Sequence, residues 1–144
     1  MKILILLFLI LLNSSLFSHT YYKKSDFDYK TTVQKIKKII IDNNLEILIN
    51  IDHSKSAKIN KLYMPPSVII IFGNAQLNTS LMQENPAWSI HLPFAVAVYN
   101  DSQGDTWIAM PNMKYYEKKL KPSPIQKKKL SFIQVTLNKI LNLN

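Results

Sequence analysis

The chain of 144 residues contains no cysteine, and this absence excludes several kinds of site. Disulfide bonds, thiolate metal ligands and a lipid-modified cysteine all need a sulfur atom that the sequence does not supply. We therefore expect the folded chain to be stabilised by its hydrophobic core alone.

Arginine is also absent, because all eighteen basic residues are lysine, and the formal net charge is +9. Arginine provides the two-pronged hydrogen bonds that recognise phosphates and bases, so we expect no nucleic-acid partner. The charge is uneven along the chain. Residues 62–113 contain three acidic residues and no lysine, whereas residues 114–144 contain eight lysines and one glutamate. A basic segment from Lys114 to Lys129 is thus a candidate for contact with acidic lipid or polymer surfaces.

The first residues have the pattern of a secretory signal peptide. Lys2 precedes an apolar run from Ile3 to Leu12, and small polar residues follow it. The run is half the length of about 20 residues that a membrane-crossing helix needs. We expect a signal peptide over residues 1–18, a periplasmic or secreted protein without an integral membrane segment, and a single domain over residues 19–144.

Hydrophobic periodicity predicts an α+β domain. Apolar residues recur at helical spacing after Asp28, alternate with polar residues from Leu45 to Asp52, and form a continuous run from Val68 to Phe72 that is typical of a strand buried on both faces. Near the end, Ser123 and Gln126 form a predicted capping box with Pro124 at the first helical position. The predicted elements are a strand at Tyr21 and Tyr22, a helix from Asp28 to about Asp42, strands at 45–52, 68–72, 94–98 and 106–110, short helices at 54–62 and 79–84, and a helix at about 124–143.

Three polar signatures surround the central apolar run, and together they resemble a known family. In order they are Ile51-Asp52-His53, Phe72-Gly73-Asn74 and His91-Leu92-Pro93, with Thr79 to Met82 between the last two. This ordered pattern, from about Asp28 to Tyr116, is similar to the bacterial family called domain of unknown function 302. The chain departs from the usual family residues at Ala75, Asn78 and His91, which stand where proline, glycine and aspartate are common.

The resemblance implies a β-α-β(4)-α two-layer sandwich, similar to the TATA-binding-protein-like class, with a curved antiparallel sheet and its helices packed on one face. The family has no established activity, so the resemblance implies architecture and no mechanism.

The candidate ligand-binding residues are Asp52, His53, Gly73, Asn74 and Met82. In the predicted strand register His53 shares the apolar, inward face, whereas Asp52 points the other way. Gly73 and Asn74 are permissive turn residues at the end of the buried strand. The leading hypothesis is a non-catalytic module that binds a small ligand or a partner in a groove between the sheet and the helices, near Asp52, His53 and Asn74. Each residue also has a structural interpretation, as a core histidine, a helix cap, a turn or a core methionine.

A second hypothesis is a metal protein or an enzyme that uses histidine. His53, His91 and Met82 could together bind a soft metal such as copper if they lay close together. Their spacing matches no metal motif, and the sequence contains no hydrolase, phosphate-loop or dinucleotide motif, so we expect no cofactor and favour a protein that is not an enzyme. A sheet covered on one face also makes a homodimer an expected partner arrangement.

Overall fold

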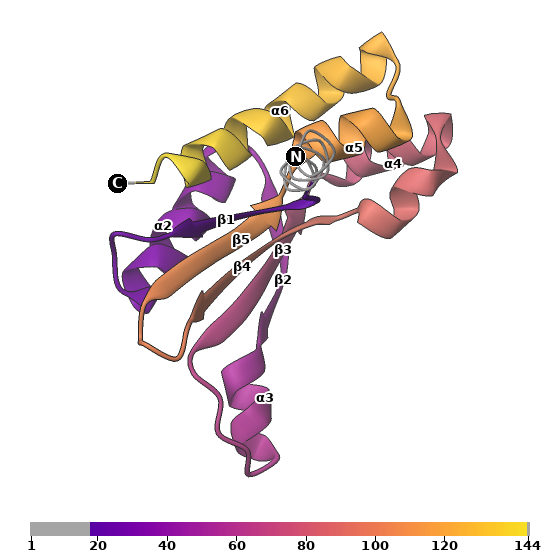
Figure 1. Ribbon diagram of the computed structural model, residues 1–144. Coiled ribbons are helices and arrows are strands. Elements are labelled where there is room, and N and C mark those ends of the chain that lie inside the picture. Colours follow the sequence, from indigo (N-terminus) through magenta and orange to yellow (C-terminus); the bar gives the residue numbers. More distant parts are fainter. Residues whose placement is uncertain (1–17, 144) are drawn as a thin grey trace, which may run out of the picture.

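A computed structural model describes residues 18–143, and the predicted signal peptide lies almost entirely outside the described residues. The described chain forms one antiparallel sheet whose helices lie on one side (Figure 1). Within residues 18–143, no helix is long and apolar enough to cross a membrane. In chain order the elements are β1 (Thr20–Lys24), α2 (Tyr29–Asp42), β2 (Glu46–Asp52), α3 (His53–Ile59), β3 (Ser67–Gly73), α4 (Ala75–Glu84), η2 (Pro86–His91), β4 (Phe94–Asn100), β5 (Thr106–Pro111), α5 (Met113–Leu120) and α6 (Pro124–Leu141).

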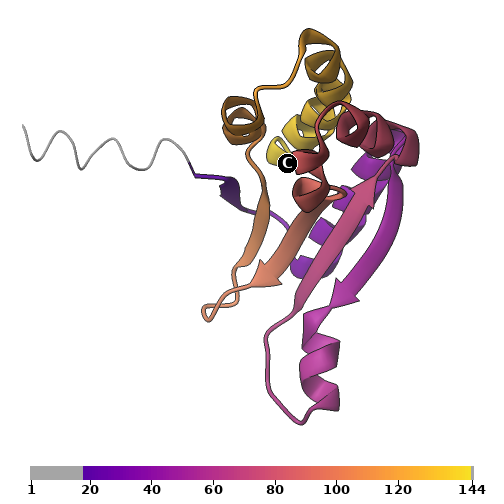
Figure 2. The same cartoon turned by 90° about the vertical axis from the view of Figure 1, so that its right-hand side faces the viewer.

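The five strands lie in the order β1-β5-β4-β3-β2, and every neighbouring pair is antiparallel. The predicted α+β class, with an antiparallel sheet and helices on one face, is therefore confirmed. Figure 2 shows that α3 extends away from the rest of the molecule, at the opposite end of the sheet from α4. The first end of β3 therefore lies near α3, and its last end lies near α4.

The core lies between the sheet and the helices α2 and α6. The strands β3, β4 and β5 contribute every second side chain to it, because successive side chains in a strand point to opposite faces. The edge strand β2 adds the partly buried Ile47. The helices contribute stripes at helical spacing, and the α4–η2 segment adds Leu81 and Trp88. The fully buried side chains with the largest volumes are Trp88, Phe72, Phe94, Ile36, Ile40, Ile70, Leu81, Ile108, Met110, Met113, Leu130 and Ile133.

The helix ends follow the predicted capping chemistry in two places. Asp28 caps α2 by accepting a hydrogen bond from the Thr31 backbone N–H at 3.0 Å. Ser123 and Gln126 form the expected capping box at the start of α6. Helix α5, whose first turn is capped by Asn112, was not predicted. Helix α4 begins at Ala75, four residues before the predicted start at Thr79.

The predicted register of β2 is wrong beyond Ile47. Ile47 pairs with Phe72 and Ile49 pairs with Ile71, so Leu48 is an extra residue that forms a β-bulge. A one-residue shift moves every later side chain to the other face of the sheet. Ile49 and Ile51 consequently lie on the face away from the helices, where they are 51% and 39% exposed.

The prediction that β3 is buried on both faces is also wrong. Val68, Ile70 and Phe72 are buried against the helices, whereas Ile69 and Ile71 are only half-buried on the opposite face. The long helices α2 and α6 lie on the other side of the sheet (Figures 1 and 2), while η2 and α5 border this opposite face at one end through His91 and Tyr116. The continuous apolar run of β3 thus supplies one buried face and one uncovered apolar face.

Gly73 stands at a close approach between segments, and not in the turn conformation that the sequence suggested. Its φ angle is not positive, and the only described glycine with positive φ is Gly104. A Cβ atom at position 73 would lie 2.9 Å from Nδ2 of the buried Asn78 and 3.5 Å from Cβ of Pro93. The missing side chain of Gly73 therefore makes room for Asn78.

Replacing Gly73 by alanine should lower the free energy of unfolding by about 1–2 kcal/mol, because the new methyl group would overpack this contact. Urea unfolding followed by tryptophan fluorescence measures the change. The matched test is the same substitution in an Asn78→Gly background, where most of the penalty should vanish. An equal penalty in both backgrounds would show that Asn78 is not the obstacle.

Candidate functional site

The five predicted ligand residues do not form one site. Asp52 pairs with Val68 at the first end of β3, while Gly73 and Asn74 lie at its last end. Asn74 follows Val68 by six positions of extended chain, so the two residues are about 20 Å apart. The expected groove shared by Asp52, His53 and Asn74 is therefore excluded by the strand pairing, and each end must be judged separately.

Asp52 and His53 lie at the start of the projecting helix α3, and both are exposed. The expectation that His53 faces the core is wrong because the bulge at Leu48 changes the register and α3 begins at His53. Asp52 caps α3: its Oδ1 accepts hydrogen bonds from the Ser54 hydroxyl at 2.6 Å and the Lys55 N–H at 2.8 Å. The hydrogen bond from the Ser54 hydroxyl, followed by the one from the Lys55 backbone, lowers the pKa of Asp52. These contacts describe a helix cap on the surface.

Asn74 borders a cavity of about 450 Å³ at the other end of the sheet. The cavity lies where the turn after α2, the first turns of α4 and the middle of α6 meet. Ligand-binding cavities commonly have volumes of about 300–1,000 Å³ and mix apolar walls with a few polar groups. Its lining residues are Asn43, Asn44, Leu45, Asn74, Gln76, Leu77, Ser80, Lys129 and Phe132.

Local hydrogen bonds hold several of these polar side chains in place. Asn74 caps α4, and its Oδ1 accepts from the Leu77 N–H at 3.0 Å. The Ser80 hydroxyl donates to the Leu77 carbonyl at 2.8 Å. Across the cavity, the amide of Asn43 donates to the Ile39 carbonyl at 2.6 Å and accepts from Lys139 at 2.7 Å. Rotation of these groups is restricted before any ligand arrives.

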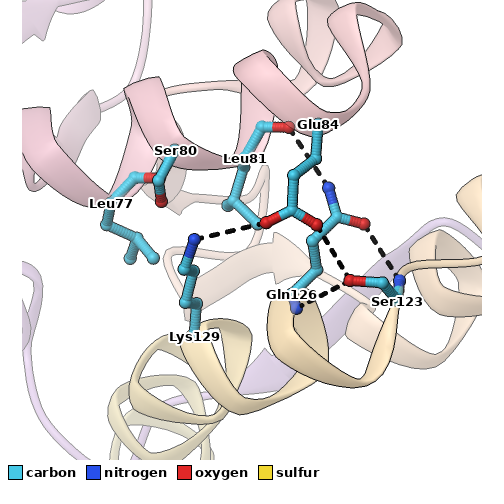
Figure 3. Close-up of polar contacts among 7 residues, drawn as sticks. All are labelled: Leu77, Ser80, Leu81, Glu84, Ser123, Gln126 and Lys129. Carbon is cyan, nitrogen blue, oxygen red and sulfur yellow. Dashed lines mark hydrogen bonds and ion pairs between the residues drawn. The ribbon is translucent and has the colours of Figure 1, made fainter.

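A polar network joins α4 to α6 beside the cavity (Figure 3). Lys129 Nζ lies 3.3 Å from Glu84 Oε1, and the Ser123 hydroxyl donates to Glu84 Oε2 at 2.9 Å. The buried amide of Gln126 donates to the Leu81 carbonyl at 3.2 Å. The network fixes the spacing of the two helices that form most of the cavity wall.

One lysine and one helix terminus give the cavity its electrostatic character, and Glu84 pairs with that lysine. Lys129 is the charged residue in its lining, and its side chain is 33% exposed. Gln76 and Leu77 place the first turn of α4 at the cavity, where a helix carries partial positive charge. Leu45, Leu77 and Phe132 supply the apolar wall.

Met82 and His91 do not contribute to this cavity. Met82 packs partly buried against the core. The His91 ring lies 4.8 Å from the Tyr116 ring, measured between centroids, beside a hollow of about 340 Å³ on the other face of the sheet. Burial, followed by the charge of Lys119, lowers the pKa of His91, so its neutral form is favoured.

The histidine-based metal arrangement is excluded by the strand pairing. Asp52, next to His53, pairs with Val68, whereas Phe94, which follows His91 by three residues, pairs with Phe72. Val68 and Phe72 are about 13 Å apart along β3, and metal ligands lie about 2 Å from the ion. In the described residues, no group of three or more His, Asp and Glu side chains could hold a metal ion.

Most cavity residues were missed by sequence reasoning because they come from three distant segments. Asn43 and Asn44 were interpreted as a helix terminator, and Asn44 does adopt a left-handed conformation with φ of 57°. Lys129 and Phe132 carried no signal beyond their place on a predicted amphipathic helix. The one signal in the sequence was an aromatic residue, Phe132, beside the predicted apolar stripe of this helix, and it is 66% exposed in the structure.

The basic segment from Lys114 to Lys129 spans α5, the start of α6 and the loop between them. Its lysines are exposed except Lys129, which is half-buried beside Glu84. They lie on two helices whose other sides pack on the core through Met113 and Leu130. This is the arrangement of an ordinary solvated helix surface.

A solved structure has a similar fold. A crystal structure of an uncharacterized conserved DUF302 protein from Bacillus stearothermophilus is similar, with a TM-score of 0.71 and 20% sequence identity over 87% of this chain and 97% of that one. Fluoride-specific ion channel FluC 1 of Brucella suis biovar 1 (strain 1330) and its namesake in Brucella abortus biovar 1 (strain 9-941) are 29% identical to this chain over 79 residues. That alignment covers 55% of this chain but only 31% and 29% of those relatives.

The family assignment rests on almost the whole described chain. The match to the family extends over residues 21–142, from the first strand to the end of the last helix. It includes all three polar signatures and the cavity at Asn74. The chain therefore belongs to the family described as Domain of unknown function DUF302.

Proposed function

We propose that this protein is an exported binding module, and that the cavity bordered by Asn74 and Lys129 holds a small amphipathic molecule. The observation that carries the proposal is the cavity itself: about 450 Å³ in volume and lined by three large apolar side chains together with amides, a hydroxyl and an ammonium group. Export is supported by the signal-peptide pattern of residues 1–18.

The ligand that fits best has a short apolar part and a carboxylate or similar acceptor. Phe132, Leu45 and Leu77 would contact the apolar part. Lys129 and the amides would contact the acceptor, and a charge-assisted hydrogen bond is worth about 1.5–3 kcal/mol. The ligand would share Lys129 with Glu84, which lies 3.3 Å from its Nζ. Without Lys2 of the predicted signal peptide, 17 lysines and 9 acidic residues give a net charge of +8, which would also favour the approach of an anion.

Native mass spectrometry of the mature protein, purified from its own host, tests both parts of the proposal. We expect a protein mass that corresponds to cleavage near residue 18, together with a retained molecule of low mass. Titration with hexanoate and with hexanol, followed by amide NMR, then compares a charged end with a neutral one. Resonances of Asn74, Ser80 and Lys129 should shift more strongly with hexanoate.

Two variants locate the binding, and each has a matched control on the same helix. Lys129→Gln should weaken hexanoate binding on the order of tenfold, whereas Lys128→Gln, at an exposed neighbour outside the cavity, should leave it unchanged. Ser80→Leu should fill the cavity and abolish binding, whereas Thr79→Leu should not. No retained molecule together with no shift from either probe would refute the proposal, as would Ser80→Leu protein that binds normally.

A further inference from the structure

The uncovered face of the sheet carries a regular row of apolar side chains across all five strands. Strand pairing aligns Ile51 with Ile69, Ile69 with Ala97, Ala97 with Ala109, and Ala109 with Tyr22. Directly paired residues point to the same face, so this row crosses the middle of that face. From β2 to β1 the row is Ile51, Ile69, Ala97, Ala109 and Tyr22, so two alanines lie between large side chains.

Charged groups are scarce on this face, although the chain has eighteen basic residues. Among the described strand residues, the register places two charged side chains here, and both are peripheral. Lys24 forms an ion pair with Asp105 at 2.6 Å. Glu46 lies at the outer corner of the edge strand β2. The centre of the face is therefore apolar and free of lysine, which is where an approaching chain of the same net charge would meet least repulsion.

We propose that a second copy of this chain covers the uncovered face, as a two-fold dimer in which the two sheets stack face to face. Tyr22 and Ile51 are 63% and 39% exposed, and the three residues between them are half-buried at the hollow of about 340 Å³ that His91 and Tyr116 also border. Apolar surface that is left exposed in this way marks an interaction site. Sheets commonly stack in this way, and a two-fold interface brings the same surface of each copy together.

The row is complementary to its own reversed copy. When the two-fold axis runs along β4, the order of the row is inverted in the second copy. Ala97 then faces Ala97, and Ile69 of each copy faces Ala109 of the other. A large side chain thus meets a small one on either side of the axis, which allows close packing. Ile51 and Tyr22, the large residues at the ends of the row, meet at the rim.

A charge at the two-fold axis tests the proposal. The wild-type protein should have the molar mass of a dimer in light scattering at micromolar concentration. Ala97→Lys should weaken dimerisation on the order of a hundredfold, because it places two like charges at the buried centre of the interface. Val135→Lys, on the 49%-exposed surface of α6, should remain dimeric and serves as the matched control. Circular dichroism establishes that both variants are folded.

The absence of native cysteine permits a second, independent test. Ala97→Cys protein should be crosslinked into a dimer by a short bis-maleimide reagent, whereas Val135→Cys protein should not. A monomeric wild-type protein would overturn the proposal. A dimer that survives Ala97→Lys, or that is crosslinked through position 135 and not through 97, would also overturn it. Neither variant touches the cavity at Asn74, so the outcome is separable from the test of ligand binding.

Discussion

Replacing Ile70 by alanine should lower the free energy of unfolding by about 2–5 kcal/mol, whereas the same change at Ile71 should cost about 1 kcal/mol or less. The two residues are adjacent in β3, but Ile70 is fully buried against the helices and Ile71 is half-buried on the uncovered face. Alanine at position 70 would leave a cavity that the packed core cannot close. Alanine at position 71 would leave a shallow surface that water can fill.

Urea unfolding measures both changes, and Trp88 provides the signal because its ring is fully buried. The comparison should be made at the lowest workable protein concentration, since a dimer would bury Ile71 and increase its contribution. The loss at position 70 is a large part of a typical domain stability of about 5–15 kcal/mol. Equal losses at the two positions in the monomer would contradict the one-sided sheet.

Replacing Gln126 by alanine should lower the free energy of unfolding by about 2–3 kcal/mol. Gln126 is 3% exposed and joins α6 to α4. Its Oε1 accepts from the Ser123 N–H at 3.0 Å, and its Nε2 donates to the Leu81 carbonyl at 3.2 Å. Alanine would leave the Ser123 N–H without its cap and would create a void between α4 and α6. The Leu81 carbonyl keeps its bond from the Asn85 N–H, which limits the loss.

Gln134→Ala is the matched control, because it makes the same change in the same helix. The Gln134 amide forms an exposed hydrogen bond to Asn138, and its loss should change stability by about 0.5 kcal/mol or less. Thermal and urea unfolding of both variants give the comparison. If Gln126→Ala were no more destabilising than Gln134→Ala, the bond between α4 and α6 would not stabilise the fold.

Local chemistry explains why much of the fold was predictable. The helix after Asp28 and the helix after Ser123 begin with caps that act within four residues. The strands from Val68 to Phe72 and after Pro93 have apolar patterns that indicate a strand from residue type alone, although the burial of each face is not decided there. The order of the elements and the one-sided helical layer followed from these signals together with the family resemblance.

The candidate site was predictable only in part. Asn74 was identified because it ends the central strand, and it borders the cavity. His53 was placed on the wrong face because a single extra residue, Leu48, shifts the register, and a bulge has no reliable sequence signal. Asp52 and Asn74 were grouped because both follow apolar runs, but antiparallel pairing puts them at opposite ends of the sheet.

The sequence by itself determined the types of the main elements, the apolar faces of the long helices and the absence of any cysteine-based site. These properties depend on residue type and on spacing within one segment. The tertiary structure alone decided that Gly73 makes room for Asn78, that Lys129 lies near Asn74, and that one face of β3 is uncovered. Each of these facts concerns residues distant in sequence, and packing between elements is what brings them together or leaves them exposed.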